Sequence, residues 1–152
     1  MDATIFTTFE LQRTDELIRM WRESFEHGVG IVDTHSIEEQ RQYFVDEILP
    51  KFNLRVAMKN NEIVGFIASD GDSIDALYIR VSEIGIGIGT SLLNWAKDRS
   101  NGKLWLFTFA RNLNAQRFYE KSGFEVIARG REPIWDLDDI KYEWSASKSA
   151  AS

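Results

Sequence analysis

The hydrophobic pattern of the sequence changes from a helical to a strand-like period near Pro50, and this change restricts the chain to a mixed α/β fold. Before Pro50, apolar residues recur mostly at helical spacing; after it, most of them fall in short runs. Polar and glycine-containing segments separate these runs, as they separate the elements of a globular domain. The expected strands are 4–9, 54–59, 62–69, 74–81, 103–109, 124–128 and 140–144, and the expected helices are 14–28, 37–49, 90–100 and 112–122.

The predicted order of elements is β-α-α-β-β-β-α-β-α-β-β, which describes an α/β fold with a mixed central β-sheet flanked by helices. A chain of 152 residues is long enough for one such domain, and we see no linker or repeat that would divide it. We expect the domain to span residues 1–144 and the small polar residues 145–152 to form a flexible tail. Residues 103–109 are apolar enough to predict a central strand that is well covered.

Three local signals mark the ends of these elements. Ser36 and Glu39 have the spacing of a capping box, which predicts the start of the second helix. Thr14 is suited to be the N-cap of the first helix, because acidic residues follow it directly. Asn60 and Asn61 tolerate the left-handed backbone conformation of a tight turn, so they predict a hairpin between two strands.

The composition excludes several classes of protein. The sequence has no Cys and two His, so it offers no disulfide, no thiolate ligand and few parts for a zinc site. Its formal net charge of −6 argues against general binding to nucleic acid. No run approaches the ~20 apolar residues of a membrane span, and the N-terminus lacks the pattern of a signal peptide. We therefore expect a cytoplasmic protein whose partners include no metal, membrane or nucleic acid.

Alternate glycines at positions 85, 87 and 89 lie between a predicted strand and a predicted helix. Such a turn lets backbone N–H groups converge on an anion, and the helix dipole adds to the attraction. The spacing differs from that of a dinucleotide fingerprint, and Thr90-Ser91 follows the last glycine where a P-loop requires Lys. Taken alone, the turn fits an anion site and a merely tight connection equally well.

A second motif follows the glycines after a further strand-like run. Together with the glycine turn, it resembles the GNAT superfamily of N-acetyltransferases, in which a G-x-G turn precedes N-x-x-A-x-x-F-Y-E-K-x-G-F. The resemblance covers residues 73–128, and the order of the earlier elements also suits the fold. The second motif reads Asn112-Leu113-Asn114-Ala115-Gln116-Arg117-Phe118-Tyr119-Glu120-Lys121-Ser122-Gly123-Phe124.

The resemblance implies an acetyl-CoA-dependent N-acetyltransferase, in which a primary amine attacks the thioester directly within a ternary complex. It implies that the pyrophosphate of coenzyme A binds at the glycine turn and that the pantetheine arm follows the preceding strand like an added strand. Asn112 matches the family residue that contacts this arm, and it also suits a plain N-cap. The implied cofactor-binding residues are Leu77, Tyr78, Ile79, Val81, Gly85, Ile86, Gly87, Ile88, Gly89, Thr90, Asn112, Ala115, Phe118 and Tyr119.

Three positions depart from the family pattern. Ile84 stands where the family has Gln or Arg, and Ile86 stands at a commonly basic position, so backbone N–H groups must bind the pyrophosphate. Phe107 stands where some members have a glutamate that acts as the general base. These departures motivate a second hypothesis, in which the chain is a weak or inactive acyl-CoA-binding or protein-interaction module on the same fold.

Two residues are candidates for the chemistry. Tyr119 matches the family's general acid, which protonates the departing sulfur of coenzyme A; the alternative is a tyrosine of the core. Asp75, on the strand before the glycine turn, is the candidate general base, acting directly or through water. Asp70, Asp72 and Glu83 are weaker candidates for that role.

The whole net charge lies in the first third of the chain. Residues 1–53 contain 11 acidic and 5 basic side chains, whereas residues 54–152 contain 13 of each. The family binds its acceptor there and at the late strands, so the charge predicts a small cationic amine, unless it merely solvates helix faces. A protein amine (N-terminal or lysine) is the alternative acceptor, and an exposed Trp144 is a candidate for a homodimer face. The candidate substrate-binding residues are Trp21, Phe25, His27 and His35, with Tyr43 and Trp135 as further aromatic walls.

Overall fold

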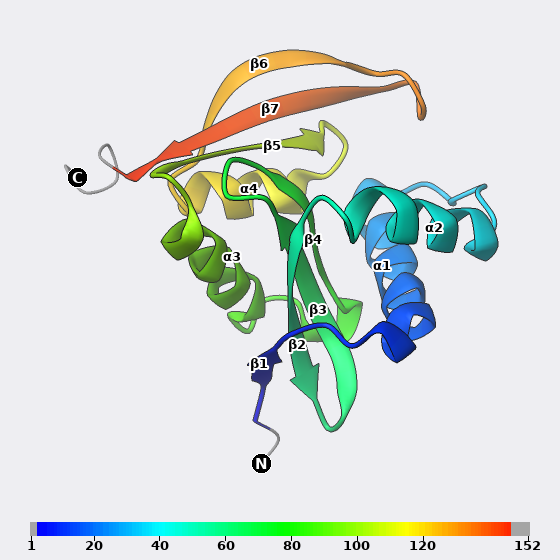
Figure 1. Ribbon diagram of the computed structural model, residues 1–152. Helices are drawn as coiled ribbons and strands as arrows, with labels where there is room; N and C mark the ends of the chain where they lie inside the picture. The colour runs from blue at the N-terminus through cyan, green and yellow to red at the C-terminus, as the bar shows by residue number, and fades with distance from the viewer. Residues whose placement is uncertain (1–2, 147–152) are drawn as a thin grey trace.

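The computed structural model describes residues 3–146 and has the predicted order of elements (Figure 1). Four strands form a first antiparallel sheet in the order β1-β2-β3-β4, and three form a second in the order β5-β7-β6. The strands are β1 (Ile5–Thr7), β2 (Asn53–Lys59), β3 (Glu62–Ser69), β4 (Ile74–Ile79), β5 (Lys103–Phe109), β6 (Glu125–Glu132) and β7 (Leu137–Ser145). The helices are α1 (Thr14–Val29), α2 (Ile37–Tyr43), α3 (Ile88–Arg99) and α4 (Leu113–Lys121), with short helical turns η1 (Leu11–Arg13), η2 (Phe44–Ile48) and η3 (Val81–Glu83).

The two sheets meet where β4 begins and then diverge. Ser73 and Trp105 form an isolated parallel bridge, and the Trp105 N–H donates to the Asp72 carbonyl at 3.1 Å. Beyond this bridge, no ladder pairs β4 with β5 in the described part of the chain. The ends of both strands therefore leave backbone groups open to a ligand between them.

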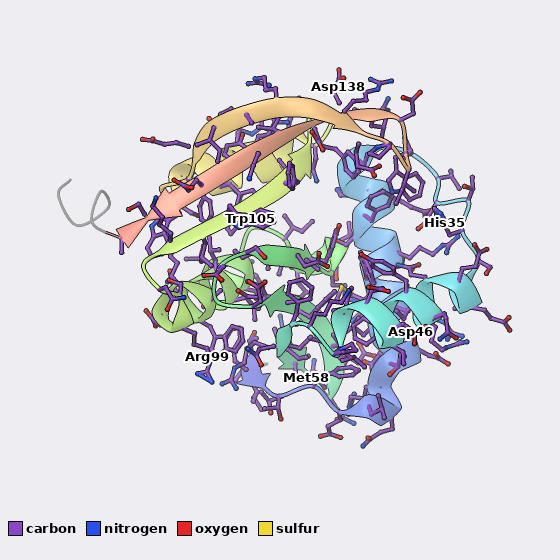
Figure 2. The ribbon with its side chains drawn as sticks, turned by 45° about the horizontal axis from the view of Figure 1, so that its top comes forward. His35, Asp46, Met58, Arg99, Trp105 and Asp138 are labelled. Atoms are coloured by element: carbon purple, nitrogen blue, oxygen red, sulfur yellow. The ribbon has the colours of Figure 1, made fainter. Side chains whose placement is uncertain are left out.

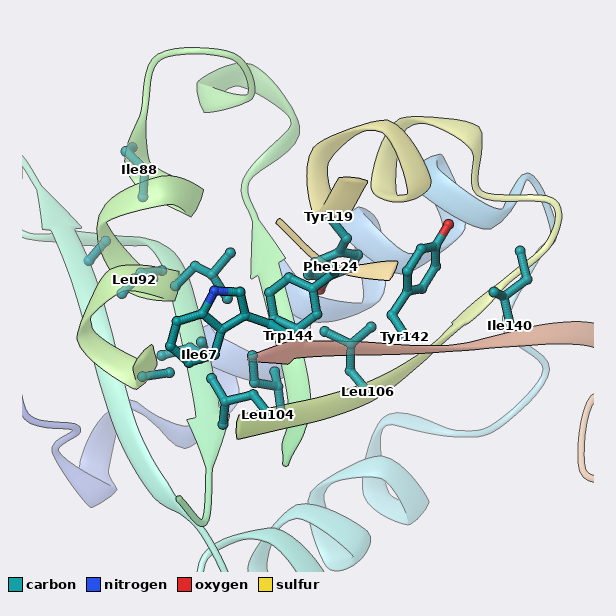
Figure 3. Close-up of a cluster of buried hydrophobic side chains, with 14 of the residues drawn as sticks. Ile67, Ile88, Leu92, Leu104, Leu106, Tyr119, Phe124, Ile140, Tyr142 and Trp144 are labelled. Carbon is teal, nitrogen blue, oxygen red and sulfur yellow. The ribbon is translucent and has the colours of Figure 1, made fainter. Parts of the chain in front are cut away.

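Helices cover both faces of the first sheet (Figure 1). On one face, Leu17 of α1 and Phe44 of η2 pack with Phe66 in a fully buried core. On the other, Leu92 of α3 joins a second core that continues beneath β5 and β7, where it meets α4. Figure 3 shows this second core, with Tyr119 and Phe124 beside Tyr142 and Trp144. One core thus links the glycine turn's helix to the helix of the second motif.

Two of the three local signals are confirmed. The Ser36 hydroxyl accepts from the Glu39 N–H, and the Glu39 carboxylate accepts from the Ser36 N–H, both at 3.1 Å, which completes the capping box. Asn60 and Asn61 have φ values of 52° and 61° in the β2–β3 hairpin. Thr14 is not the N-cap, because η1 runs directly into α1 and the Thr14 hydroxyl donates to the Leu11 carbonyl at 2.6 Å.

Two expectations about burial were wrong. β5 is the edge strand of the second sheet and β7 is its centre. The outer face of β5 also lacks a covering layer. Trp105 and Phe107 on that face are 39% and 55% exposed. Trp144 is only 6% exposed because it packs in the second core, so it offers no surface for a homodimer. β7 extends through Ser145, and residues 147–152 of the expected tail lie outside the described residues.

Candidate active site

A cleft of about 320 Å³ opens where β4 ends, between the glycine turn and the start of α4. The cleft lies on the line along which the two sheets diverge, and the last two turns of α1 complete its wall. It brings together segments that are far apart in the sequence. The lining residues are Ser24, His27, Gly28, Leu77, Tyr78, Ile79, Glu83, Ile84, Gly85, Gly87, Gly89, Thr90, Asn112, Asn114, Ala115, Phe118 and Tyr119.

The glycine turn presents open backbone to this cleft. Gly85 and Gly87 have φ values of +87° and +93°, a conformation that residues with a side chain rarely adopt. Nothing lies within 4 Å of where a Cβ atom would be at either position. Gly87 is the N-cap of α3, so the N–H groups of Ile88, Gly89 and Thr90 have no intrahelical acceptor. The first turn of α3 has no acidic residue. A turn with this geometry can accept an anion.

The charge around the turn is nearly balanced. No Lys or Arg is among the described residues that line the cleft. Its one carboxylate, Glu83, pairs with Lys59 at 3.0 Å, and both side chains are largely buried. The pair cancels the charge that would repel an anion. The donors available to an anion at the turn are thus its backbone N–H groups and neutral side chains such as that of Thr90.

The N-terminus of α4 is held closely against α1. The Asn112 side chain caps α4 by accepting from the Ala115 N–H at 3.1 Å. A Cβ at Gly28 would lie 2.7 Å from the Asn112 Nδ2, so only glycine permits this approach. Arg111 donates from Nε to the Val29 carbonyl at 3.0 Å, which ties the end of α1 to the β5–α4 connection. The amide of Asn112 is therefore fixed at the wall of the cleft.

A smaller cavity of about 80 Å³ lies on the other side of the same opening, between β4 and β5. It shares Leu77, Tyr78, Asn112, Ala115 and Tyr119 with the larger cleft, so the two spaces are adjacent. We call it the acceptor cavity. Its remaining lining residues are Val29, Ile74, Asp75, Ala76, Leu106, Phe107, Thr108 and Phe109.

Tyr119 lines both spaces. Its side chain is buried, with the Phe118, Phe124 and Tyr142 rings centred 5.2, 5.5 and 6.1 Å away. Burial raises the pKa of Tyr119 well above its ordinary value, because the tyrosinate would lose its hydration. The phenol therefore stays protonated, and it can donate a proton but cannot take one up.

Asp75 lies on β4 and lines the acceptor cavity only. Its pKa is raised, first by partial burial of the carboxyl and then by repulsion from Asp70, while Lys51 acts in the opposite direction. A carboxylate with a raised pKa accepts a proton more readily than an ordinary aspartate does. The opening thus has a proton donor at the junction of the two spaces and a proton acceptor on one side.

An aromatic cluster flanks the acceptor cavity at the α1–α2 loop. Phe25 packs against Phe109 and Trp135, with ring centres 6.1 and 5.1 Å apart, and Trp135 contacts His35 at 4.9 Å. The His35 Nδ1 lies 3.0 Å from the buried carboxylate of Asp33. In Figure 2, His35 lies on this loop, near the tip of the β6–β7 hairpin. The cluster connects the hairpin to α1.

The structure brings together most of the residues that the sequence singled out. His27 lines the larger cleft instead of the acceptor cavity. Trp21 packs against Phe44, Phe66 and Tyr78 in the first core and lines neither space. The side chain of Ile88 is buried in the second core, and Val81 and Ile86 are exposed outside both linings. Residues that line the opening but were not singled out as site residues are Ser24, Gly28, Val29, Ile74, Ala76, Leu106, Thr108, Phe109 and Asn114.

These additional residues had no signal of their own in the sequence. Ser24, Gly28 and Val29 belong to the last turns of α1, more than eighty positions before α4. Their place at the opening follows from the contact between α1 and Asn112, which no local pattern encodes. Only the requirement for a small residue at position 28 hints at it.

Among residues 3–146, no helix is both long enough and apolar enough to span a bilayer. These residues also contain no group of three or more His, Cys, Asp or Glu side chains arranged to hold a metal ion.

The splayed sheets, the glycine turn and the tyrosine at the junction fit an acyl-CoA-dependent transferase. Residues 50–126 match the acetyltransferase (GNAT) domain family, and the chain belongs to this family, whose acyl donor is acetyl-CoA. It is 31% identical, over 83% of each chain, to the peptidyl-lysine N-acetyltransferase YjaB of Salmonella typhimurium. Its fold is similar to that of apo YjaB from Escherichia coli, with a TM-score of 0.76, 23% identity and coverage of 93% and 97% of the two chains. It is also similar to that of the PaiA N-acetyltransferase of Thermoplasma acidophilum in complex with coenzyme A, with a TM-score of 0.74, 19% identity and coverage of 94% and 99%.

Proposed function

We propose that this acetyltransferase acts on lysine side chains of proteins, by direct attack of the amine on the thioester in a ternary complex. The junction at Tyr119 carries the proposal, because a protonated phenol there borders both an anion-binding cleft and a cavity with a carboxylate. When bound, acetyl-CoA supplies an activated acetyl group and a thiolate leaving group. In this proposal, Asp75 takes the proton of the amine and Tyr119 gives one to the sulfur.

We propose the same roles for the cleft residues as the family resemblance implies. The N–H groups of the glycine turn and of Thr90 bind the pyrophosphate, and the edge of β4 at Leu77–Ile79 pairs with the pantetheine arm. The Asn112 amide contacts this arm from α4. Because no cationic side chain lines the cleft, binding relies on backbone geometry rather than on ion pairs.

Three observations favour a lysine side chain as the acceptor. The relatives named YjaB are peptidyl-lysine N-acetyltransferases. The acceptor cavity holds about 80 Å³, roughly the liquid volume of three water molecules, which suits the end of one aliphatic amine. The exposed outer face of β5 leaves room beside the cavity for the rest of a polypeptide. A small cationic amine is the second candidate, favoured by the carboxylate of Asp75.

The test is release of free thiol from acetyl-CoA with two sets of acceptors. One set contains lysine peptides with blocked N-termini, and the other contains polyamines, aminoglycosides and amino acids. The proposal predicts the higher kcat/KM for the peptides. A higher kcat/KM for the small amines would make a small amine, and not a protein lysine, the acceptor. Tight binding of acetyl-CoA without turnover on any amine would refute the proposed acetyl transfer.

A further inference from the structure

Lys141 carries an amine that contacts a residue of the acceptor cavity wall, Phe107. It lies on β7 directly opposite Phe107 of β5, on the outer face of the second sheet. Its Nζ lies 4.7 Å from the ring centre of Trp105 and 5.7 Å from that of Phe107. Phe107 is one of the residues that line the acceptor cavity. Figure 2 shows Trp105 on this open face.

The ammonium of Lys141 is held weakly. Within residues 3–146, it has no carboxylate at ion-pair distance, whereas Lys51, Lys59 and Lys103 each have one. A cation–π contact at a partly exposed site favours the bound position by only about two- to fivefold. The four-carbon stem of lysine is flexible, so the amine can leave the two rings at little cost.

We propose that Lys141 is a self-acetylation site of this enzyme. The inference rests on the proposed reaction, with Lys141 taking the place of an acceptor lysine. The amine travels with the chain, so its effective concentration at the cavity is high when no other acceptor is present. The larger cleft, the acceptor cavity and the amine then belong to one molecule.

The step balances as an ordinary acyl transfer. The ammonium of Lys141 gives its proton to Asp75 and thence to solvent. The neutral Nζ forms a bond to the acetyl carbonyl carbon, the carbon–sulfur bond breaks, and the nitrogen loses a second proton to solvent to give the neutral amide. The sulfur leaves with the proton of Tyr119, which solvent restores. The products are acetyl-Lys141, free coenzyme A thiol and one proton.

Acetylation of Lys141 changes the surface beside the cavity. The amide carries no charge, so the cation–π contacts with Trp105 and Phe107 are lost. Both rings then become available to an incoming lysine. After the modification, the enzyme's own amine therefore no longer competes with other acceptors for these two rings.

The experiment incubates the purified chain with acetyl-CoA and no acceptor, and maps acetylated lysines by mass spectrometry of peptides. Acetylation of Lys141 is expected at a rate per molecule that does not depend on protein concentration. Tyr119→Phe is expected to slow it at least about a hundredfold, because general acid catalysis is lost. Lys141→Arg abolishes the modification at that position, and Lys103→Arg, on the same sheet, leaves acetylation of Lys141 unchanged.

A parallel assay with a lysine peptide separates this inference from the proposed function. If the peptide is acetylated in a Tyr119-dependent reaction and Lys141 is not, the self-acetylation is refuted and the proposed function stands. If neither is acetylated, both are refuted. Equal acetylation of Lys141 in the Tyr119→Phe variant shows uncatalysed chemistry and overturns the inference, as does a rate that rises with protein concentration.

A structural readout needs no acetyl-CoA. The ε-methylene protons of Lys141 lie near two aromatic rings, so ring currents are expected to shift their NMR signals upfield. Trp105→Leu should move these signals toward the positions of the other lysines. Signals that already coincide with those of a solvated lysine would refute the placement on which the inference depends.

Discussion

Tyr119 and Asp75 have environments that suit opposite proton-transfer roles. Burial keeps the phenol protonated, while the carboxylate is only partly buried and faces the acceptor cavity alone. Both pKa values are raised, but one group remains an acid and the other becomes a better base near neutral pH. We therefore expect the two side chains to affect different parts of the pH profile.

Tyr119→Phe keeps the ring and its packing and removes only the hydroxyl. We expect kcat to fall by about 10²–10⁴, the usual contribution of general acid catalysis, with the Kd of acetyl-CoA nearly unchanged. Steady-state kinetics and calorimetry measure the two quantities. An unchanged kcat would exclude the phenol as the proton donor.

Asp75→Asn removes the proposed base and keeps the shape of the side chain. In the unmodified enzyme, kcat/KM should rise with pH through a pKa that is higher than that of an ordinary aspartate, because Asp75 must be ionised to accept a proton. In the variant, we expect kcat/KM to fall about 10²-fold or more and its rise with pH through this pKa to disappear. Asp72→Asn, in the turn before β4, is the matched control. If kcat/KM of Asp75→Asn still rose with pH through the same pKa, a residue other than Asp75 would be the general base.

Among the elements, the turn before α3 depends most on the conformational freedom of glycine. Gly85 and Gly87 adopt positive φ, and together they expose the backbone to the cleft. The same need for positive φ is met at Gly71, which lies in a different turn between β3 and β4. Comparing the two turns separates backbone strain from ligand binding.

Gly87→Ala and Gly71→Ala should each lose about 1–2 kcal/mol of unfolding free energy, because both residues would hold a left-handed conformation. Only Gly87→Ala should also weaken binding of coenzyme A, since it distorts the N-terminus of α3. Chemical denaturation and calorimetry give the two values. If the two variants bound coenzyme A with equal affinity, the glycine turn would not be part of the binding site.

The contact between α1 and α4 gives a second prediction at this scale. Gly28→Ala places a Cβ 2.7 Å from the Asn112 Nδ2, so the amide must move away from the cleft. Alanine also gains up to about 1 kcal/mol of helix propensity over glycine, which offsets the crowding. We expect a nearly unchanged Tm with lower affinity for acetyl-CoA. Full affinity in this variant would show that the position of Asn112 is unimportant.

The elements themselves were largely predictable, because their signals are local. The capping box at Ser36 and the asparagine turn at Asn60 act within a few residues, and both form as expected. The burial of β5 was not predictable, since an apolar run looks the same in a central strand and in an edge strand. The exposed rings of this strand, Trp105 and Phe107, lie beside the acceptor cavity, and the apolar run alone did not predict their exposure.

At the scale of the whole molecule, the opening exists because two antiparallel sheets meet at the bridge between Ser73 and Trp105 and then diverge. The motifs of the sequence predicted the glycine turn and α4, which lie close together in the chain. They did not predict the wall from α1, because Gly28 and Asn112 are far apart in the sequence and meet only through the tertiary fold. The site is therefore a property of the complete fold.

The buried tyrosines link the stability of the fold to pH. Burial raises the pKa of Tyr78 to about 12, and burial together with the hydrogen bond to Glu120 raises that of Tyr142 to about 12, from 10.0. The folded state holds these protons more tightly than the unfolded state does. The stabilisation is thus complete below pH 10 and is lost as the pH rises toward 12.

We expect the unfolding free energy to be independent of tyrosine ionisation at neutral pH and to fall above pH 10. The loss should be about 1.4 kcal/mol per pH unit for each tyrosine that ionises only in the unfolded state. Denaturation at a series of alkaline pH values measures it, and Tyr142→Phe should make the decline shallower. An identical decline in the variant would show that Tyr142 does not contribute.

The division of the opening into a donor cleft and an acceptor cavity is tested most directly by an NMR titration of backbone amides. Coenzyme A should shift the signals of residues 77–79, 84–90 and 112–119, and leave Asp75 and Phe107 little changed. A lysine peptide added next should shift Asp75, Phe107 and Phe109. Shifts from coenzyme A that cluster instead at the cavity between β1 and the β2–β3 hairpin, around Phe9 and Met58, would contradict the account.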